Sequence, residues 1–348
     1  MSQIIKEYHS HERSDETRSL RLLLQLYPSL IKRLERFFLL LGLTSILIAC
    51  ASKPRQSTSS PPLPSSQPMA EATSRQRVQL SGDVAQALKS AKLVLIGETH
   101  DHPLHHHYQA EIIRILKPKV VAFEMLDSRH SEILKTLFDQ PANTWDRLLD
   151  WTHRGWPDFE IYQPIFEAAH EVGAVLIPAH PTPEILHPLM MGQDLPSKLK
   201  ATLRLDRPLP DAESAELSEL IRDAHCGHAN PAIIQAMIKA QRLKDAWMAK
   251  TLLDHPVPSV LIVGRGHTHE RWGVPWALKQ LSEAPPPVLV IELTPEASPP
   301  REATSQHATT AQTSIKITLP AHRTDDPCDR FREQLQKMKE RHSDSSTK

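Results

Sequence analysis

The residues best suited to chemistry follow four short apolar stretches, each at the point where a buried strand is expected to end. A polar side chain directly after a buried apolar run needs a partner, a metal ion or water. Because parallel strands end at one edge of a sheet, we expect these side chains to meet there. They comprise Glu98 and His100 after 93–96, Glu124 after 120–123, His180 after 174–177 and His267 after 260–263.

Two kinds of chemistry suit this set of residues. Glu98, His100 and His267 would make a divalent-metal site with one coordination position open for water. Without a metal, His100 oriented by Glu124 could deprotonate water directly. Taken singly, Glu98 or His267 could simply cap a helix or hydrogen-bond a loop. The pattern Gly-x-x-His, which occurs at two strand ends with Glu124 between them in the sequence, favours a functional site.

The elements that must position these residues alternate between strand and helix. Continuous apolar runs of this length are typical of strands buried on both faces, and a fifth run follows at 288–293. Pro103 suits the first turn of a helix. The apolar residues of this helix, at close to helical spacing, are Leu104, Tyr108, Ile112 and Ile115. Further helices are expected at 159–171 and 212–255. The alternation predicts an α/β fold: a mainly parallel β-sheet with helices on both faces and a ligand site at the carboxyl ends of the strands.

Three other polar features carry weaker signals. At most two of the consecutive His105–His107 can point at one site, because no helix places three successive residues on one face, so the others are expected to be solvated. Gln241, Asp245 and Met248 share one face of the helix expected there, where they could also form a polar row between helices. Cys226 lies beside two histidines, but one cysteine at that spacing is a weak metal signal, and a structural role is expected.

The overall composition excludes several classes of protein. The chain has 41 Lys+Arg and 41 Asp+Glu, and this zero net charge argues against a nucleic-acid binder, which normally needs a cationic face. Three cysteines in 348 residues cannot build a disulfide framework. The 30 prolines and only 10 glycines indicate proline-rich linkers around a compact body.

The first part of the chain reads as an export signal. A basic segment precedes the apolar run 37–49, which is too short to span a membrane but suits the core of a signal peptide. The run ends in Leu47-Ile48-Ala49-Cys50, which resembles a bacterial lipobox, so Cys50 would become the diacylated first residue of the mature protein. Residue 51 is not Asp, so we expect an outer-membrane lipoprotein facing the periplasm. The alternative is an uncleaved anchor with an incidental cysteine.

The rest of the chain divides by composition. After the signal peptide at 1–49, a Ser/Pro-rich tether at 50–75 cannot bury apolar surface and should be extended. The α/β domain is expected at 76–295. A polar tail at 296–348 carries a possible strand at 314–319 and a charged helix at about 326–341.

Several motifs of this domain, in order along the chain, resemble those of the ChaN-like haem-binding lipoproteins of the Tiki, TraB and erythromycin-esterase-like superfamily. The resemblance covers about residues 90–293 and coincides with the lipobox. Its motifs are Gly97-Glu98-Thr99-His100-Asp101 with His105-His106 and Gln109, Phe123-Glu124-Met125, Ala240-Gln241 with Asp245 and Met248-Ala249, and Gly264-Arg265-Gly266-His267 with Gly273-Val274-Pro275.

The resemblance implies a lipoprotein for haem and iron uptake in which a homodimer encloses two stacked haems. Each iron would be held by a tyrosine of one subunit, while His and Lys side chains of the other contact the propionates. Tyr108 and Tyr162 are the tyrosines that follow Cys50, and Tyr162 is the first choice. Either could instead be a core residue with its hydroxyl satisfied. His105 or His106 would be the fallback ligand, and Gln241 and Asp245 belong to the same motif set.

The same superfamily also contains enzymes. In these, a Glu and His pair after the first strand and a His after a late strand bind metal or act in general-base hydrolysis. Glu98, His100, Glu124 and His267 match these positions, so the alternative function is a metal-dependent or Glu/His-dependent hydrolase such as a peptidase or esterase. A third possibility is a non-catalytic lipoprotein that only docks other envelope proteins.

Overall fold

The computed structural model describes residues 82–296 and 313–323, together with residues 325, 326, 328, 329, 332, 333 and 336. Contacts between Cα atoms divide the chain into Met1–Gln76 and Arg77–Lys348, and every described residue belongs to the second unit. The predicted signal peptide, Cys50, the tether and most of the predicted helix at 326–341 lie outside the described residues. Within the described part of the chain, no helix is long and apolar enough to cross a membrane.

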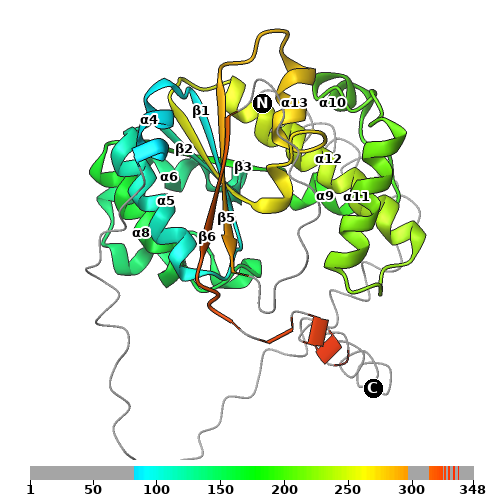
Figure 1. Cartoon of the computed structure of the whole chain (residues 1–348), viewed down its shortest axis with the longest axis horizontal. Coiled ribbons are helices and arrows are strands. Elements are labelled where there is room, and N and C mark those ends of the chain that lie inside the picture. The colour runs from blue at the N-terminus through cyan, green and yellow to red at the C-terminus, as the bar shows by residue number, and fades with distance from the viewer. Residues whose placement is uncertain are drawn as a thin grey trace, which may run out of the picture. The chain divides into compact units, whose positions relative to one another are not determined.

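Six strands form one sheet in the order β3-β2-β4-β1-β5-β6, and every neighbouring pair is parallel (Figure 1). The α/β fold with a parallel sheet is therefore confirmed. Central strands β1 and β4 are buried along their whole length, as their continuous apolar runs predict. The strands are β1 (Leu93–Glu98), β2 (Val120–Asp127), β3 (Val175–His180), β4 (Ser259–Gly264), β5 (Val288–Pro295) and β6 (Thr313–Leu319).

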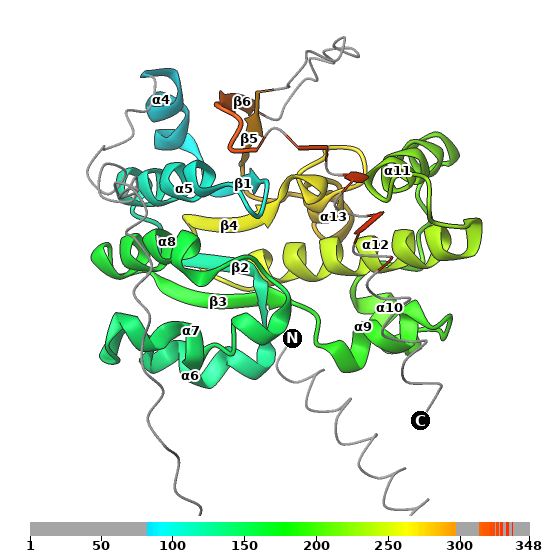
Figure 2. The same cartoon turned by 90° about the horizontal axis from the view of Figure 1, so that it is seen from below.

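Helices cover both faces of the sheet, with α5 and α8 on one face and α12 and α13 on the other (Figure 2). The aromatic and aliphatic core lies mainly under α5 and α8, whereas α11, α12 and Trp272 enclose a smaller apolar cluster. The α-helices are α4 (Gly82–Ser90), α5 (Pro103–Leu116), α6 (Ser131–Thr136), α7 (Trp145–Leu148), α8 (Phe159–Glu171), α9 (Pro183–Met190), α10 (Ser197–Thr202), α11 (Asp211–Ala224), α12 (Pro231–Leu253) and α13 (Val274–Leu281).

The structure refines three expectations from the sequence. The long helical region splits into α11 and α12, because Cys226 and Gly227 both adopt positive φ and Asn230 caps a new helix that begins at Pro231. β3 is an edge strand, so Val175 is 59% exposed rather than buried. The buried face of α5 is more polar than expected, since it contains His106 and Gln109, while Ile115 is 42% exposed.

The segment expected to be a tail completes the sheet. β6 pairs in parallel with β5, so the sheet extends beyond residue 295. After β6, the Pro320 carbonyl accepts a hydrogen bond from His102 Nε2 at 3.0 Å, and His322 Nε2 lies 3.4 Å from an Asp101 carboxylate oxygen. The chain therefore passes beside the loop that follows β1.

A disulfide bond joins Cys226, between α11 and α12, to Cys328, which follows β6. The bond closes a loop between residues 102 positions apart, and the two Cα atoms are 5.6 Å from each other. The expectation of a structural role for Cys226 agrees with this bond. The cysteine count argues against a disulfide framework, yet two of the three cysteines form this bond.

Candidate functional site

The carboxyl edge of the sheet holds a continuous buried network of carboxylates and imidazoles. β1 ends at Glu98 and leads to His100, and the turn after β4 carries His267. Glu124 lies on β2 and is itself buried. Three helices packed against the sheet supply the remaining members: His106 and Gln109 from α5, Tyr162 from α8, and Gln241 and Asp245 from α12.

Glu98 accepts three hydrogen bonds and lies beside a fourth polar group, the His106 imidazole, although its side chain is completely buried. Oε1 receives the Tyr162 hydroxyl at 2.6 Å and lies 2.9 Å from His100 Nδ1. Oε2 receives Gln109 Nε2 at 2.5 Å and lies 3.3 Å from His106 Nδ1. Burial alone would raise the pKa of this carboxyl, but the charges and hydrogen bonds of His106 and His100 lower it to about 2. Glu98 is therefore a carboxylate in the folded protein.

Tyr162 is fixed at the centre of this cluster. It is fully buried, its ring packs 4.0 Å from that of His106, and its hydroxyl donates to Glu98. Burial and the adjacent Glu98 charge raise the pKa of the Tyr162 hydroxyl well above its ordinary value. The phenol is consequently neutral and already committed as a donor.

A second cluster surrounds His267. Its Nε2 is 3.1 Å from Glu124 Oε1, and its Nδ1 is 2.6 Å from Asp245 Oδ1. Burial lowers the pKa of His267, but the two carboxylates outweigh this effect and raise it to about 9. The imidazole of His267 is therefore protonated, so it can donate a hydrogen bond to a carboxylate on each side.

Glu124 and Asp245, the two carboxylates beside His267, differ in the hydrogen bonds that they accept. Glu124 Oε2 accepts the Gly264 amide at 2.7 Å, and despite burial the nearby His267 charge holds the pKa of Glu124 well below its ordinary value. Asp245 Oδ2 has no hydrogen-bond partner in the described part of the chain, and burial raises the pKa of Asp245 to about 6. Gln241 does not fill this gap, because its Nε2 donates to the Gly266 carbonyl and lies 2.8 Å from His267 Nδ1.

His100 connects the two clusters. Its Nδ1 contacts Glu98, its Nε2 lies 4.0 Å from Glu124 Oε2, and 33% of its side chain is exposed. Burial lowers the pKa of His100, but the Glu98 hydrogen bond and the Glu124 charge raise it above its ordinary value overall. A Cβ at Gly264 would lie 2.6 Å from His100 Nε2, so glycine is required at that strand end for His100 to enter the site.

The structure brings together most of the residues predicted for a site. Glu98, His100, Glu124 and His267 form one chain of contacts. The residues that the sequence assigned to the same motif set bond to these four or to the turn that carries His267. His106 donates to the His100 carbonyl, Tyr162 donates to Glu98, Asp245 accepts from His267, and Gln241 donates to the Gly266 carbonyl.

Other predicted residues lie elsewhere. His105, a fallback haem ligand in the sequence prediction, accepts the Thr99 amide at Nδ1 and stacks on His102, so it is buried outside the network. His180 contacts the Pro181 carbonyl instead of the network. Tyr108 is half-buried on α5 and packs against the edge of the main core.

The predicted divalent-metal site is not formed by these residues. Glu98 and His267 are separated by His100 and Glu124, and the side-chain atoms of both are already engaged by other partners. In the part of the chain that the structure describes, no group of three or more His, Cys, Asp or Glu residues is placed to hold a metal ion.

Sequence reasoning missed the partners that hold Glu98 in place. Gln109 entered only as part of a family motif, and Tyr162 was expected to face a ligand rather than Glu98. One signal was available: His106 and Gln109 are three positions apart on one helix, and both are polar in a stretch that has to be buried against β1.

Comparisons with known proteins agree with this fold. The family model described as "Haem-binding uptake, Tiki superfamily, ChaN" matches residues 84–278. A search of curated protein sequences gives no significant match. Among solved structures, the chain is similar to that titled "Cofacial heme binding to ChaN of Campylobacter jejuni", with 21% identity over 61% of this chain and 85% of the other and a TM-score of 0.52.

A weaker similarity is to the type III effector HopBA1, with 13% identity over 68% of this chain and 93% of the other and a TM-score of 0.37. The family model spans more than half of the chain, from α4 through α13, and includes every residue of the buried network. The chain therefore belongs to the haem-binding uptake family of the Tiki superfamily, the family of ChaN.

Proposed function

We propose that this protein binds haem in the bacterial cell envelope and takes part in haem or iron uptake. Family membership over residues 84–278 is the observation that carries the proposal. The related ChaN of Campylobacter jejuni is described as binding haem cofacially, and we extend this arrangement to the present chain as a homodimer with haem at its interface. Haem is a large apolar ring with two anionic propionates, which suits a site shared between two surfaces.

The proposed location is the outer membrane facing the periplasm. Cys50 at the end of an apolar run would carry the lipid anchor, and 50–75 would be the tether. The Cys226–Cys328 disulfide supports an oxidising compartment, because such bonds rarely persist in the cytosol.

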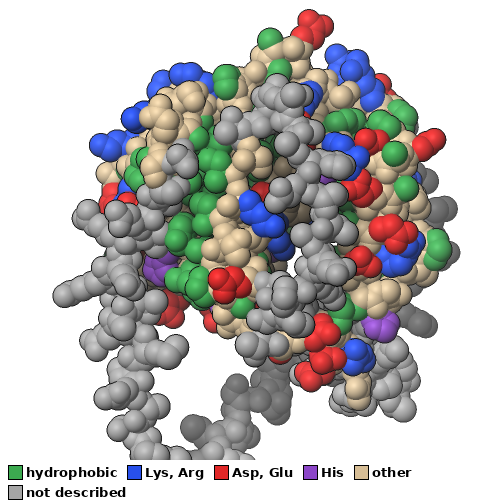
Figure 3. Space-filling view, viewed as in Figure 1, with side chains coloured by type: hydrophobic (Ala, Val, Ile, Leu, Met, Phe, Trp, Pro, Cys, Tyr) green, Lys and Arg blue, Asp and Glu red, His purple; other side chains and the backbone are tan. Residues whose placement is uncertain are grey.

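Tyr108 is the better candidate for an iron ligand in this structure. A tyrosine that ligates haem iron does so as tyrosinate. Tyr162 fits this role poorly, since it is fully buried, donates to Glu98 and has a pKa raised well above its ordinary value. Tyr108 is half-buried and shares a face of α5 with Leu104 and the exposed Ile115. Hydrophobic side chains also gather between α5 and the edge of the sheet in Figure 3.

His105, His106, Gln241 and Asp245 are better assigned to the interior than to the haem. His106 and Gln241 already bond within the network, and His105 is buried against His102. We therefore propose that these residues support the loops around the site, while Tyr108 faces the iron. When bound, the haem would supply the iron centre itself, and this chain would supply the axial ligand and an apolar surface.

A haem titration of the full chain in neutral maltoside micelles tests the proposal. Saturation in the Soret region with a ferric tyrosinate spectrum, together with a mass change to dimer in light scattering, is the expected result. Tyr108→Phe should abolish that spectrum and weaken binding by about tenfold or more, while its matched control Tyr162→Phe should retain it. The opposite ranking would assign Tyr162 as the ligand, and absence of a stable haem complex would overturn the function.

One observation favours a second candidate function, general-base hydrolysis. His100 is the partly exposed member of the network, and its Nδ1 contacts the buried Glu98 carboxylate. In its neutral form His100 would take a proton from water at Nε2, and Glu98 would stabilise the resulting imidazolium. Because the pKa of His100 is raised, this base would become active at a higher pH than an ordinary histidine.

Hydrolysis of small esters and peptide amides across a pH series tests this candidate. The rate should rise as pH passes the His100 pKa, and His100→Gln should remove the pH dependence. His180→Gln is the matched control, since His180 lies at the same sheet edge but outside the network. A rate that is absent, or that His100→Gln leaves unchanged, would exclude this activity without bearing on haem binding.

A further inference from the structure

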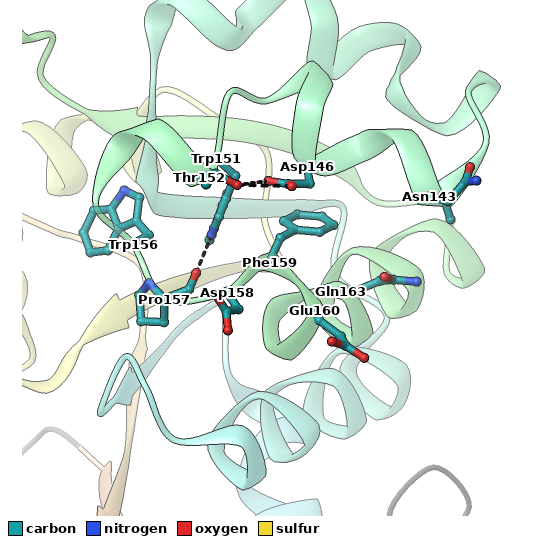
Figure 4. Close-up of a pocket in the computed structure, with 11 residues that line it drawn as sticks. Asn143, Asp146, Trp151, Thr152, Trp156, Pro157, Asp158, Phe159, Glu160 and Gln163 are labelled. Carbon is teal, nitrogen blue, oxygen red and sulfur yellow. Dashed lines mark hydrogen bonds between the residues drawn. The ribbon is translucent and has the colours of Figure 1, made fainter. Parts of the chain in front are cut away.

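A separate cavity lies on the far side of Trp156 from the buried network. Its volume is about 350 Å³, which is the lower end of the range for small-molecule sites. It opens between the turns around α7 and the first turn of α8 (Figure 4). Three aromatic and three acidic side chains dominate its lining: Trp151, Trp156, Phe159, Asp146, Asp158 and Glu160.

Of the three aromatic side chains in the wall, Trp156 offers the most accessible ring surface, because Trp151 is 1% exposed and Phe159 7%. Trp151 is almost fully buried, and its ring N–H donates to the Pro157 carbonyl at 2.8 Å. It packs edge-on against Phe159, with ring centres 5.3 Å apart. Trp156 is half-buried and touches His100 edge-on, so one part of its indole is held while another faces the cavity. Such ring faces carry partial negative charge and attract cations.

The polar part of the wall is negative. No Lys, Arg or His lines the cavity, all of whose lining residues are described. Asp158 occupies the N-cap position of α8 but makes no capping hydrogen bond with its side chain. Figure 4 shows Asp158 and Glu160 on one side of the aromatic rings and Asp146 on the other. Carboxylates thus flank the ring surface, although the chain as a whole has no net charge.

We propose that this cavity binds an organic cation whose charge is spread over alkyl groups or a planar group, such as a quaternary ammonium or a guanidinium. Aromatic faces favour weakly hydrated cations of this kind, and flanking carboxylates add attraction at both sides. A haem does not suit the cavity, because its propionates would meet three carboxylates and no cation. The proposal is therefore a second site, independent of the haem function.

Two matched ligand pairs test it on the full chain in maltoside micelles, with tryptophan fluorescence and calorimetry as readouts. Choline is compared with its neutral isostere 3,3-dimethylbutan-1-ol, and arginine amide with citrulline amide. We expect millimolar or tighter binding of at least one cation and about tenfold weaker binding of its neutral partner. Choline alone would indicate a small alkylammonium compound, and arginine amide alone would indicate a basic peptide side chain.

Substitutions of the lining residues test whether the cations bind in this cavity. The double variant Asp158→Asn with Glu160→Gln should weaken cation binding by about fivefold or more, and Trp156→Leu should weaken it similarly. Glu132→Gln is the control, because Glu132 is an exposed carboxylate on α6 outside the cavity. Equal binding of charged and neutral partners, no saturation by either cation, or indifference to the double variant would each overturn the proposal.

Discussion

Two carboxylates of the network, Glu98 and Asp245, are equally buried but have opposite electrostatic behaviour. Glu98 accepts three hydrogen bonds and has the His106 imidazole beside it, and its pKa falls to about 2. Asp245 Oδ2 has no partner among the described residues, and the pKa of Asp245 rises to about 6. Burial acts in the same direction on both groups. The donors that the fold supplies therefore set the pH at which a buried carboxyl ionises.

Of the substitutions considered, removal of the Glu98 charge should reduce the free energy of unfolding most. Glu98→Gln keeps the shape of the side chain but leaves donors from Tyr162, His100 and His106 facing an amide. We expect a loss of about 3–5 kcal/mol in the free energy of unfolding at pH 7. Urea denaturation measures it, with Glu132→Gln as the exposed control. If Glu98→Gln lost no more stability than Glu132→Gln, the hydrogen bonds and neighbouring imidazoles would not be what stabilises the Glu98 carboxylate.

The charge of His267 gives a pH test. Its folded pKa of about 9 lies above the ordinary value of 6.5, so its ion pairs stabilise the fold fully below pH 6.5 and are lost as pH rises through 9. This window corresponds to at most about 3 kcal/mol. Urea midpoints measured from pH 6 to 10 should fall for the wild type and stay nearly flat for His267→Gln. Parallel curves for the two proteins would contradict a charged His267.

Removing a single donor should have a smaller effect. Tyr162→Phe deletes one of the three hydrogen bonds to Glu98 without removing the ring from the core. We expect destabilisation of about 1–2 kcal/mol. The folded pKa of Glu98 should rise, so the acid-side loss of stability, which begins near pH 4.5 in both proteins, should be smaller in the variant and complete at a higher pH. Acid titrations followed by circular dichroism of both proteins would measure this shift, and coincident titrations would contradict the assignment.

Asp245 should be the least sensitive position. Because its folded pKa of about 6 lies above the ordinary 3.8, its ionised form is disfavoured in the fold, at a cost that is present above pH 6 and disappears below pH 3.8. Asp245→Asn should therefore change stability at pH 7 by less than about 1 kcal/mol, since lost attraction to His267 and relieved desolvation oppose each other. A loss comparable with that of Glu98→Gln would remove the distinction between the two carboxylates.

The sequence predicted the sheet and the edge where the network forms, because apolar runs that end in polar residues are local signals. Glu98, His100, Glu124 and His267 could be named on that basis. The sequence could not show that Glu98 and His267 belong to separate clusters, since this depends on which side chains α5, α8 and α12 bring to each. The contacts of Tyr162 could not be predicted from the sequence either. The helical spacing places Tyr162 on an apolar face of its helix, but it does not show that this face packs against the Glu98 carboxylate.

The Cys226–Cys328 bond has a consequence for how the chain matures. If the chain is exported with its amino terminus first, as we propose, Cys226 has no partner but Cys50 until Cys328 emerges from the membrane. That pairing would fix the amino-terminal segment to the turn before α12. If Cys50 is acylated as we propose, its sulfur is no longer a thiol when Cys328 emerges. The lipid would then act as a protecting group as well as an anchor, leaving one possible disulfide in the finished protein.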